Sequence, residues 1–203
     1  MARPRQHAPE ELHARVMAAC DEWLKTQPIH ALSLRSIARE VGCAPSTLLK
    51  LYGSFSNLLQ YVNIDTLNDL RERIDADYTC ADPGQRIHRL AKFYWQFAHE
   101  HPYRWQLLFE HPLAQEGELD QRQNMMIEQL FVRVEQTLRE IQPDLAAIEA
   151  NRMARSLWGS VHGLVQLGLA RRLGSWEGAP LEVDELLDKL LGTIIKGLRY
   201  HKE

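Results

Sequence analysis

The sequence predicts an all-α protein of about nine helices, and three observations lead to that fold class. Apolar residues recur at helical spacing along almost every segment, as they do on one face of a helix. Proline and glycine fall between these segments, where helices stop. No stretch alternates between apolar and polar residues over six or more positions, so essentially no sheet is expected.

The first 52 residues are predicted to form three short helices. The first runs from Pro9 to Gln27, with apolar side chains along one side. Ser33 is a suitable N-cap for the second, because its hydroxyl can accept a hydrogen bond from an unpaired amide of the first turn. Gly42 suits the end of that helix, and Pro45 suits the first turn of the third, where an amide would have no partner. This order over residues 33–52 is typical of a helix-turn-helix motif.

The third helix is predicted to present polar side chains outward. Leu48 and Leu51 face the core. Ser46, Thr47 and Lys50 are left on the outside, near the N-terminal end of the helix. A helix that enters the major groove meets base edges and phosphates at that end. The motif therefore predicts DNA binding, and the alternative is an ordinary helical hairpin inside an all-α core.

Six more helices are predicted beyond the motif. Prolines, glycines and N-capping residues set their limits, as at Asp82, which precedes a proline at the first helical position. Their expected ranges are about 56–78, 83–101, 103–110, 119–141, 145–173 and 181–200. We therefore divide the chain into a helix-turn-helix domain at residues 9–55 and a larger helical domain at residues 56–203.

Composition and charge describe a globular protein with one mildly basic end. Hydrophobic residues make up 45% of the chain, charged residues make up 25%, and the formal net charge is −3. Residues 1–60 carry seven Lys or Arg against five Asp or Glu, whereas residues 61–203 carry seventeen against twenty-two. The basic end suits contact with a phosphate backbone, while the overall charge excludes a protein that coats nucleic acid throughout.

The cysteines and the apolar stretches indicate a soluble, cytoplasmic protein. Cys20, Cys43 and Cys80 are odd in number and widely separated, so they are expected to be reduced thiols. A redox-sensor role for Cys43, in the turn of the motif, is the alternative. The start of the chain lacks the apolar core of a signal peptide, and the apolar stretch Ser156–Ala170 is too short to span a bilayer. No membrane partner is expected.

The last two predicted helices carry more apolar surface than one protomer can easily cover. Between Leu186 and Leu198, apolar doublets recur every four residues. The preceding helix has small residues that permit close packing: Ala154, Gly159, Gly163 and Gly168. A four-helix bundle of two copies would bury the excess, so we expect a homodimer built on residues 145–173 and 181–200. The alternative places both helices in the core of a monomer.

The chain resembles TetR-type transcriptional regulators over nearly its full length. In the N-terminal domain the resemblance rests on residue types and spacing in Arg15–Leu24, Leu32–Ala38, Val41–Gly42 and Thr47–Leu48. In the C-terminal domain it rests on two segments that are similar to a subgroup with a Trp and a His-Gly pair, Phe97–Tyr103 and Trp158–Gly163. The resemblance implies an all-α homodimer that binds operator DNA, usually represses transcription, and is released by a small ligand in the C-terminal domain.

Three departures from the family pattern bear on DNA binding. Leu49 and Phe55 stand where family members commonly have a Tyr and a Lys that touch the DNA backbone, and Ala44 replaces a small polar cap. Lys50 and Tyr52 are expected to supply part of the missing contacts, and an arm before the first helix to add others. The expected DNA-contacting residues are Arg3, Arg5, Ser33, Arg35, Pro45, Ser46, Thr47, Lys50 and Tyr52.

Aromatic and methionine side chains of the larger domain are candidates for a ligand cavity. Few charges fall among them, which favours an apolar or aromatic effector with His162 as a polar contact. The candidate residues are Tyr94, Trp95, Trp105, Phe109, Met125, Met126, Trp158 and His162. Plain core packing is the alternative for each of them.

No catalytic, metal or cofactor site is expected. His99 and His101 lie two positions apart, so a helix does not bring their imidazoles to one face. The chain has neither a phosphate-binding Gly-rich loop nor a serine nucleophile elbow. We therefore expect a non-enzymatic, homodimeric repressor that a small effector releases from its operator. The alternative is an all-α dimeric interaction module whose helix-turn-helix no longer reads DNA.

Overall fold

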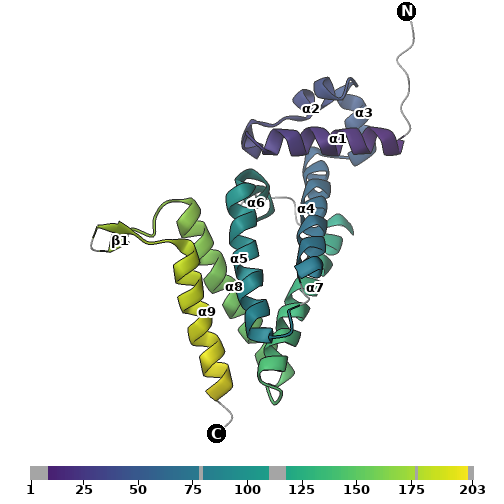
Figure 1. The fold of residues 1–203 in the computed structure, drawn as a ribbon. Coiled ribbons are helices and arrows are strands. Elements are labelled where there is room, and N and C mark those ends of the chain that lie inside the picture. Colours follow the sequence, from purple (N-terminus) through teal and green to yellow (C-terminus); the bar gives the residue numbers. More distant parts are fainter. Residues whose placement is uncertain (1–8, 78–79, 110–117, 177, 201–203) are drawn as a thin grey trace, which may run out of the picture. The chain divides into compact units, whose positions relative to one another are not determined.

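The computed structural model describes residues 9–77, 80–109, 118–176 and 178–200, and in this part of the chain it contains nine α-helices (Figure 1). They are α1 (Pro9–Leu24), α2 (Leu34–Glu40), α3 (Pro45–Tyr52), α4 (Phe55–Asp77), α5 (Pro83–Glu100), α6 (Pro102–Phe109), α7 (Glu118–Ile141), α8 (Ala147–Leu169) and α9 (Val183–Tyr200). A short 3₁₀ helix, Ile29–Ala31, precedes α2. Two-residue strands, β1 (Ser175–Trp176) and β2 (Ala179–Pro180), pair antiparallel between α8 and α9. The predicted all-α fold is confirmed.

Two compact units divide the described residues. The N-terminal unit takes those within Met1–Asn68 and His101–Gln123, and the C-terminal unit takes those within Asp69–Glu100 and Asn124–Glu203. This division differs from the predicted boundary at residue 55. The physical reason is that apolar side chains from the first part of α4 and from α6 belong to the same core as α1, α2 and α3: Leu58, Leu59, Val62 and Leu107.

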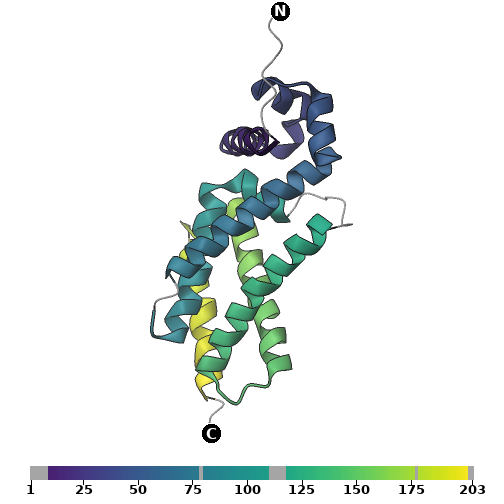
Figure 2. The ribbon, with the colours of Figure 1, turned by 90° about the vertical axis from the view of Figure 1, so that its right-hand side faces the viewer.

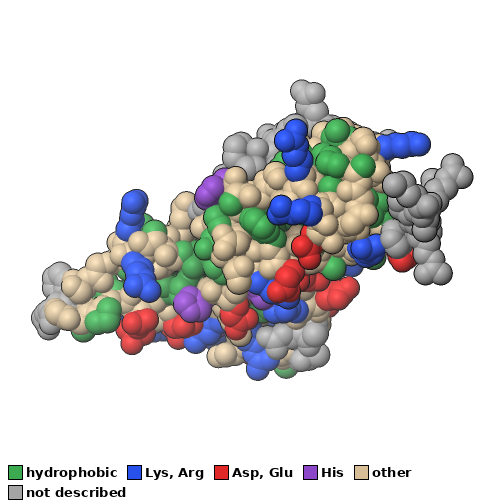
Figure 3. Space-filling model, turned by 90° about the horizontal axis from the view of Figure 1, so that it is seen from above, with side chains coloured by type: hydrophobic (Ala, Val, Ile, Leu, Met, Phe, Trp, Pro, Cys, Tyr) green, Lys and Arg blue, Asp and Glu red, His purple; other side chains and the backbone are tan. Residues whose placement is uncertain are grey.

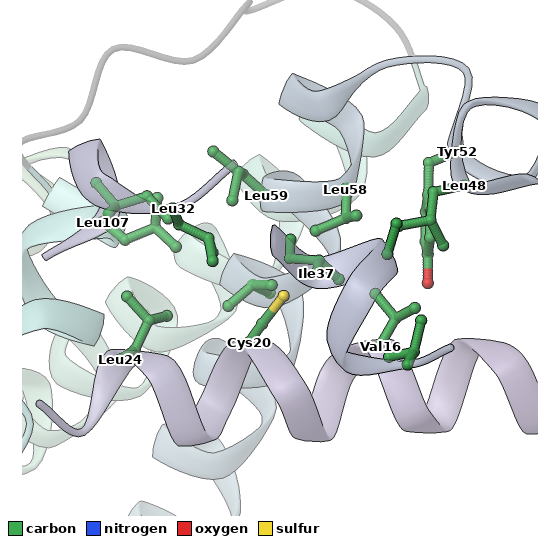
Figure 4. Close-up of a cluster of buried hydrophobic side chains, with 14 of the residues drawn as sticks. Val16, Cys20, Leu24, Leu32, Ile37, Leu48, Tyr52, Leu58, Leu59 and Leu107 are labelled. Atoms are coloured by element: carbon green, nitrogen blue, oxygen red, sulfur yellow. The ribbon is translucent and has the colours of Figure 1, made fainter. Parts of the chain in front are cut away.

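A hydrophobic core holds α1, α2 and α3 together. Four side chains of α1 are buried at the four-residue interval of one helical face: Leu12, Val16, Cys20 and Leu24. Figure 4 shows Ile37 of α2 and Leu48 of α3 on the side of α1 that carries these residues. Burial raises the pKa of the Cys20 thiol to about 12, so the thiol stays protonated at neutral pH.

Helices α5, α8 and α9 pack against one another in the C-terminal unit and lie side by side in Figures 1 and 2. The buried face of α9 consists of Val183, Leu187, Leu191, Ile195 and Leu198. Toward α5, Nζ of Lys92 donates to Oδ2 of Asp188 at 3.0 Å, and this bond holds the pKa of Asp188 below its ordinary value. Because exposed ion pairs of this kind contribute little stability, the apolar face carries the packing.

Capping residues begin two of the helices as the sequence predicted. The Ser33 hydroxyl accepts from the Ser36 amide at 3.1 Å, and the Ser36 hydroxyl accepts from the Ser33 amide at 3.0 Å, which closes a capping box on α2. Before α5, Oδ1 of Asp82 accepts from the amides of Gly84 at 2.7 Å and Gln85 at 3.1 Å. The bonds from Gln85 and Gly84 hold the pKa of Asp82 below its ordinary value.

The glycines of α8 differ in what surrounds them. A Cβ at Gly168 would overlap Cγ2 of Val183 on α9 and would lie 3.5 Å from the ring of Trp95 on α5. A Cβ at Gly159 or Gly163 would meet no other atom within 4 Å. The backbone of α8 therefore approaches α5 and α9 closely at Gly168, whereas Gly159 and Gly163 lie on an open face.

Candidate nucleic-acid interface

Helices α2 and α3 are joined by a tight turn, as the motif predicted. Gly42 has φ +71°, a left-handed conformation that glycine adopts at little cost, and the Cys43 amide donates to the Ala38 carbonyl at 2.9 Å. Helix α3 begins at Pro45 after Ala44, which provides no side-chain cap. Burial raises the pKa of the Cys43 thiol, and a thiol that stays protonated does not favour the redox-sensor alternative.

Most side chains expected to contact DNA are exposed. The exposed members of that set are Ser33, Arg35, Pro45, Ser46, Thr47 and Lys50. Leu49, which departs from the family pattern, has 46% of its surface exposed. Arg3 and Arg5 lie outside the described residues. Figure 3, which views the molecule from above the orientation of Figure 1, shows separate Lys and Arg side chains projecting around uncharged and apolar surface.

Tyr52 does not occupy the position that the predicted DNA contact requires. The residue is 5% exposed, its hydroxyl is hydrogen bonded to Nδ1 of His13 at 2.9 Å, and its ring centroid lies 5.6 Å from that of Tyr61. Burial also raises the pKa of the Tyr52 hydroxyl well above its ordinary value. The structure corrects the prediction, because Tyr52 lies one turn after Leu48 on the core side of α3 and packs against α1 and α4.

Two arginines tie the helices of the N-terminal unit together. Nη2 of Arg15, on α1, donates to the Val41 carbonyl at 2.6 Å, at the C-terminal end of α2. Nε of Arg104, on α6, donates to Oγ1 of Thr66 at 3.2 Å, and its Nη1 lies 3.3 Å from Oδ1 of Asp21 on α1. Side-chain bonds therefore link both α2 and α6 to α1.

Three of the predicted effector residues meet in the C-terminal unit. The Tyr94 hydroxyl, on α5, is hydrogen bonded to Nδ1 of His162, on α8, at 2.7 Å. The ring centroid of Trp158 lies 4.9 Å from that of His162. Two further residues extend this cluster: Phe131 packs edge to face on Trp158 at 5.9 Å, and the Arg155 guanidinium lies 4.5 Å from the Phe131 ring centroid. The sequence analysis missed both, although Arg155 precedes Trp158 by one helical turn.

The other predicted effector residues are divided between the two units. In the C-terminal unit, Trp95 and Met126 are half-buried. Met125 is 60% exposed and Trp158 is 40% exposed, so the described residues enclose neither side chain fully. In the N-terminal unit, Trp105 is buried with its ring centroid 5.5 Å from that of Phe109.

In the part of the chain that the structure describes, no group of three or more His, Cys, Asp or Glu side chains is placed to hold a metal ion. No helix there is long and apolar enough to cross a membrane.

Comparison with known proteins identifies the class that this fold and motif define. Residues 87–194, more than half of the chain, match the family model described as the tetracyclin repressor-like C-terminal domain. The helix-turn-helix of α2 and α3 precedes that segment. The chain belongs to the TetR family of transcriptional regulators.

The similar proteins include curated regulators and solved structures. HTH-type transcriptional regulator Rv1816 from Mycobacterium tuberculosis is 30% identical over 112 residues, which are 54% of this chain and 48% of that protein. The chain thus spans about half the length of the curated relatives it matches. A protein of unknown function from Rhodococcus sp. RHA1 has a TM-score of 0.75 at 22% identity, over 98% of this chain and 100% of that one. FadR from Bacillus subtilis, in complex with stearoyl-CoA, has a TM-score of 0.65 at 16% identity, over 91% and 98%. These structures share the fold.

Proposed function

We propose that this protein is a cytoplasmic, homodimeric repressor that binds double-stranded operator DNA through α3 and is released by a small-molecule effector. One observation carries the proposal of DNA binding. Leu48 anchors α3 in the core, while Ser46, Thr47 and Lys50 are exposed on the same helix. A helix anchored in this way can enter the major groove without disturbing the core behind it.

Lys50 is the strongest candidate for a DNA contact among the described residues of α3. It is the only basic residue of that helix and is exposed. A lysine ammonium binds a phosphate as a point charge, or a guanine edge in the major groove. Leu49, next to it, offers apolar contact to a thymine methyl group instead of the backbone contact that a Tyr would make.

Lys50→Ala is expected to weaken DNA binding, and the pattern of the loss identifies the contact. If Lys50 binds a phosphate, affinity falls for all sequences and the slope of log K against log salt becomes shallower by about one unit. If it reads a guanine, the loss is confined to one base position, at about 1–3 kcal/mol. Fluorescence anisotropy with operator variants at several salt concentrations measures both quantities.

Lys25→Ala is the matched control for the loss of one positive charge. Lys25 lies after α1, where its Nζ is 2.6 Å from Oε2 of Glu22 and 3.8 Å from Oδ2 of Asp21. Its charge is thus already balanced, and its removal is expected to leave the salt slope unchanged. If Lys50→Ala and Lys25→Ala had the same DNA affinity and the same salt slope, Lys50 would not contact DNA. This result would favour the interaction module, an alternative that the exposed Leu49 and the uncapped start of α3 also support.

The homodimer is proposed on the outer faces of α8 and α9. In each apolar doublet of α9, one residue is buried in the C-terminal unit and the other is partly exposed. The partly exposed residues are Leu186, Leu190 and Ile194. Along α8, one stripe of the helix is open or exposed at Ile148, Ser156, Gly159, Gly163 and Leu167. Apolar and small residues on two adjacent helices are what a twofold four-helix interface buries.

The effector is proposed to be apolar or aromatic and to bind beside Tyr94, Trp158 and His162. Their rings supply apolar faces, and the hydrogen-bonded pair of Tyr94 and His162 supplies one polar position. FadR from Bacillus subtilis shares the fold and is in complex with stearoyl-CoA, which supports a ligand site in a helical body of this kind.

Helix α4 is proposed to carry the signal from effector to DNA. It is one helix of 23 residues (Figure 2), and its two parts belong to different units. Its Leu58 and Leu59 pack in the core of the motif, and Arg104 links its Thr66 to Asp21 on α1. A ligand that favours one position of α4 would therefore favour one position of α3. A hundredfold loss of DNA affinity requires about 2.7 kcal/mol of such coupling.

A further inference from the structure

Three aromatic rings from three different helices meet at the C-terminal end of α3. They are His13 of α1, Tyr52 of α3 and Tyr61 of α4. The ring centroids lie 5.8 Å apart for His13 and Tyr52, 5.3 Å for His13 and Tyr61, and 5.6 Å for Tyr52 and Tyr61. Aromatic pairs at such distances are stabilised beyond the burial of their surface. The cluster therefore joins α3 to α1 and to α4.

Tyr52 links α3 to its neighbours by hydrogen bonds as well as by its ring. Its hydroxyl is hydrogen bonded to Nδ1 of His13 at 2.9 Å, and its main-chain carbonyl accepts from Nδ2 of Asn57, on α4, at 3.0 Å. Burial raises the pKa of this hydroxyl, so it stays protonated at neutral pH. A buried hydroxyl that loses its partner costs more free energy than an average hydrogen bond contributes. The ring nitrogen of His13 is therefore what satisfies the buried hydroxyl of Tyr52.

The position of Tyr52 determines the direction of the exposed side chains of α3. Leu48 and Tyr52 are four residues apart and are the buried residues of one face. Lys50 is two residues from each of them, about 200° around the helix, and is exposed. Leu48 lies in an apolar core, where contacts are not directional, whereas the hydrogen bond of Tyr52 favours one orientation. A turn of α3 about its own axis would therefore break the bond of Tyr52 and move Lys50 at the same time.

We propose that His13 is a positioning residue for operator recognition: through Tyr52 it holds α3 in the orientation in which Thr47 and Lys50 meet the major groove. Without the bond, α3 occupies several orientations, and only the fraction that matches the groove binds the operator. The apparent dissociation constant then rises by the inverse of that fraction. Binding to DNA of any sequence depends on phosphate contacts, which carry no sequence information and demand less of the orientation. The role of His13 rests on the proposed DNA binding by α3.

The test removes either partner of the hydrogen bond and keeps both rings. His13→Phe and Tyr52→Phe are each expected to lower affinity for DNA from the region upstream of the protein's own gene by about 3- to 10-fold. Affinity for a scrambled fragment of equal length should stay unchanged at low salt. The double variant should lose less than the two single losses together, because both changes remove the same bond. His13→Asn, whose Oδ1 can replace Nδ1 as the acceptor, should lose less than His13→Phe. Fluorescence anisotropy measures each affinity.

Trp23→Phe is the matched control for a hydrogen bond lost elsewhere on α1. Nε1 of Trp23 donates to the Pro28 carbonyl at 3.3 Å, and the variant keeps an aromatic ring. It should lower Tm but leave operator affinity unchanged at a temperature at which circular dichroism shows every protein folded.

Four results would overturn the role of His13: unchanged operator affinity in Tyr52→Phe, an equal loss for scrambled DNA, additive losses in the double variant, or the same loss in Trp23→Phe. If His13→Phe does not fold, Tyr52→Phe and His13→Asn decide between these outcomes. A wild-type protein that does not distinguish the two fragments is a different result, because the proposed operator recognition then fails and the role of His13 fails with it.

Discussion

Leu190→Asp is expected to convert the proposed dimer into a monomer and to lower operator affinity at least about a hundredfold. Leu190 lies on the partly exposed side of α9, so an Asp there should leave the protomer folded. In the proposed dimer the same carboxylate would be buried without a partner, at a cost of about several kcal/mol. A monomer also contacts one half-site and loses the contribution of the second. Light scattering measures the mass, and anisotropy measures the affinity.

Lys196→Asp is the control for placing an Asp elsewhere on α9. Lys196 is exposed, so this variant should remain dimeric and bind DNA as the wild type does. Circular dichroism establishes that both variants are folded before the masses are compared. A Leu190→Asp protein that is folded and still dimeric would mean that the two copies meet through other surfaces.

Gly168→Ala is expected to destabilise the C-terminal unit by about 1–3 kcal/mol, because its added methyl group overlaps the side chain of Val183. Valine has a single strongly preferred side-chain rotamer in a helix, so Val183 cannot easily turn away. The Trp95 ring lies on the other side of the added carbon, at 3.5 Å. Thermal unfolding should show a Tm lower by about 2–4 °C for each kcal/mol.

Gly192→Ala is the control that shows whether overlap with Val183 causes the destabilisation by Gly168→Ala. Gly192 lies within α9, and a Cβ there would meet no other atom within 4 Å. Alanine is the better helix former by about 0.8–1 kcal/mol, so this variant is expected to be more stable than the wild type. If Gly168→Ala were stabilising as well, α8 and α9 would not be in the close contact described.

Local signals in the sequence were sufficient to predict where the helices lie. They predicted the last residue of a helix less well. Ser33 and Asp82 cap α2 and α5 as predicted, because a cap needs only a side chain and an amide two or three residues away. Helix α8 was expected at 145–173 but spans Ala147–Leu169. Arg171 takes a positive φ of 52° just after that helix, and an arginine gives no advance sign of such a conformation.

Packing partners could not be predicted in the same way. Gly159, Gly163 and Gly168 are alike in sequence, yet only Gly168 lies against another helix. Helical spacing identifies residues that share a face, but it does not say which element covers that face or whether solvent does.

Helical spacing also explains which candidate side chains were expected on the exposed side of their helix and which were not. The outward position of Ser46, Thr47 and Lys50 follows from the spacing of the apolar residues in α3, and the structure exposes all three. Tyr52 was misplaced, because a ring with one polar atom suits core and surface equally. His13 was overlooked, because the spacing of apolar residues along α1 does not show that its Nδ1 meets the Tyr52 hydroxyl.

The most direct test of the proposed function is the salt dependence of binding to DNA from the region upstream of the protein's own gene. A dimer with two exposed α3 helices should bind that fragment more tightly than a scrambled one of equal length. If it neutralises about six phosphates, log K should fall with log salt at a slope of about −5. No binding at low salt, or equal affinity for both fragments at every salt concentration, would contradict sequence-specific operator recognition by this protein.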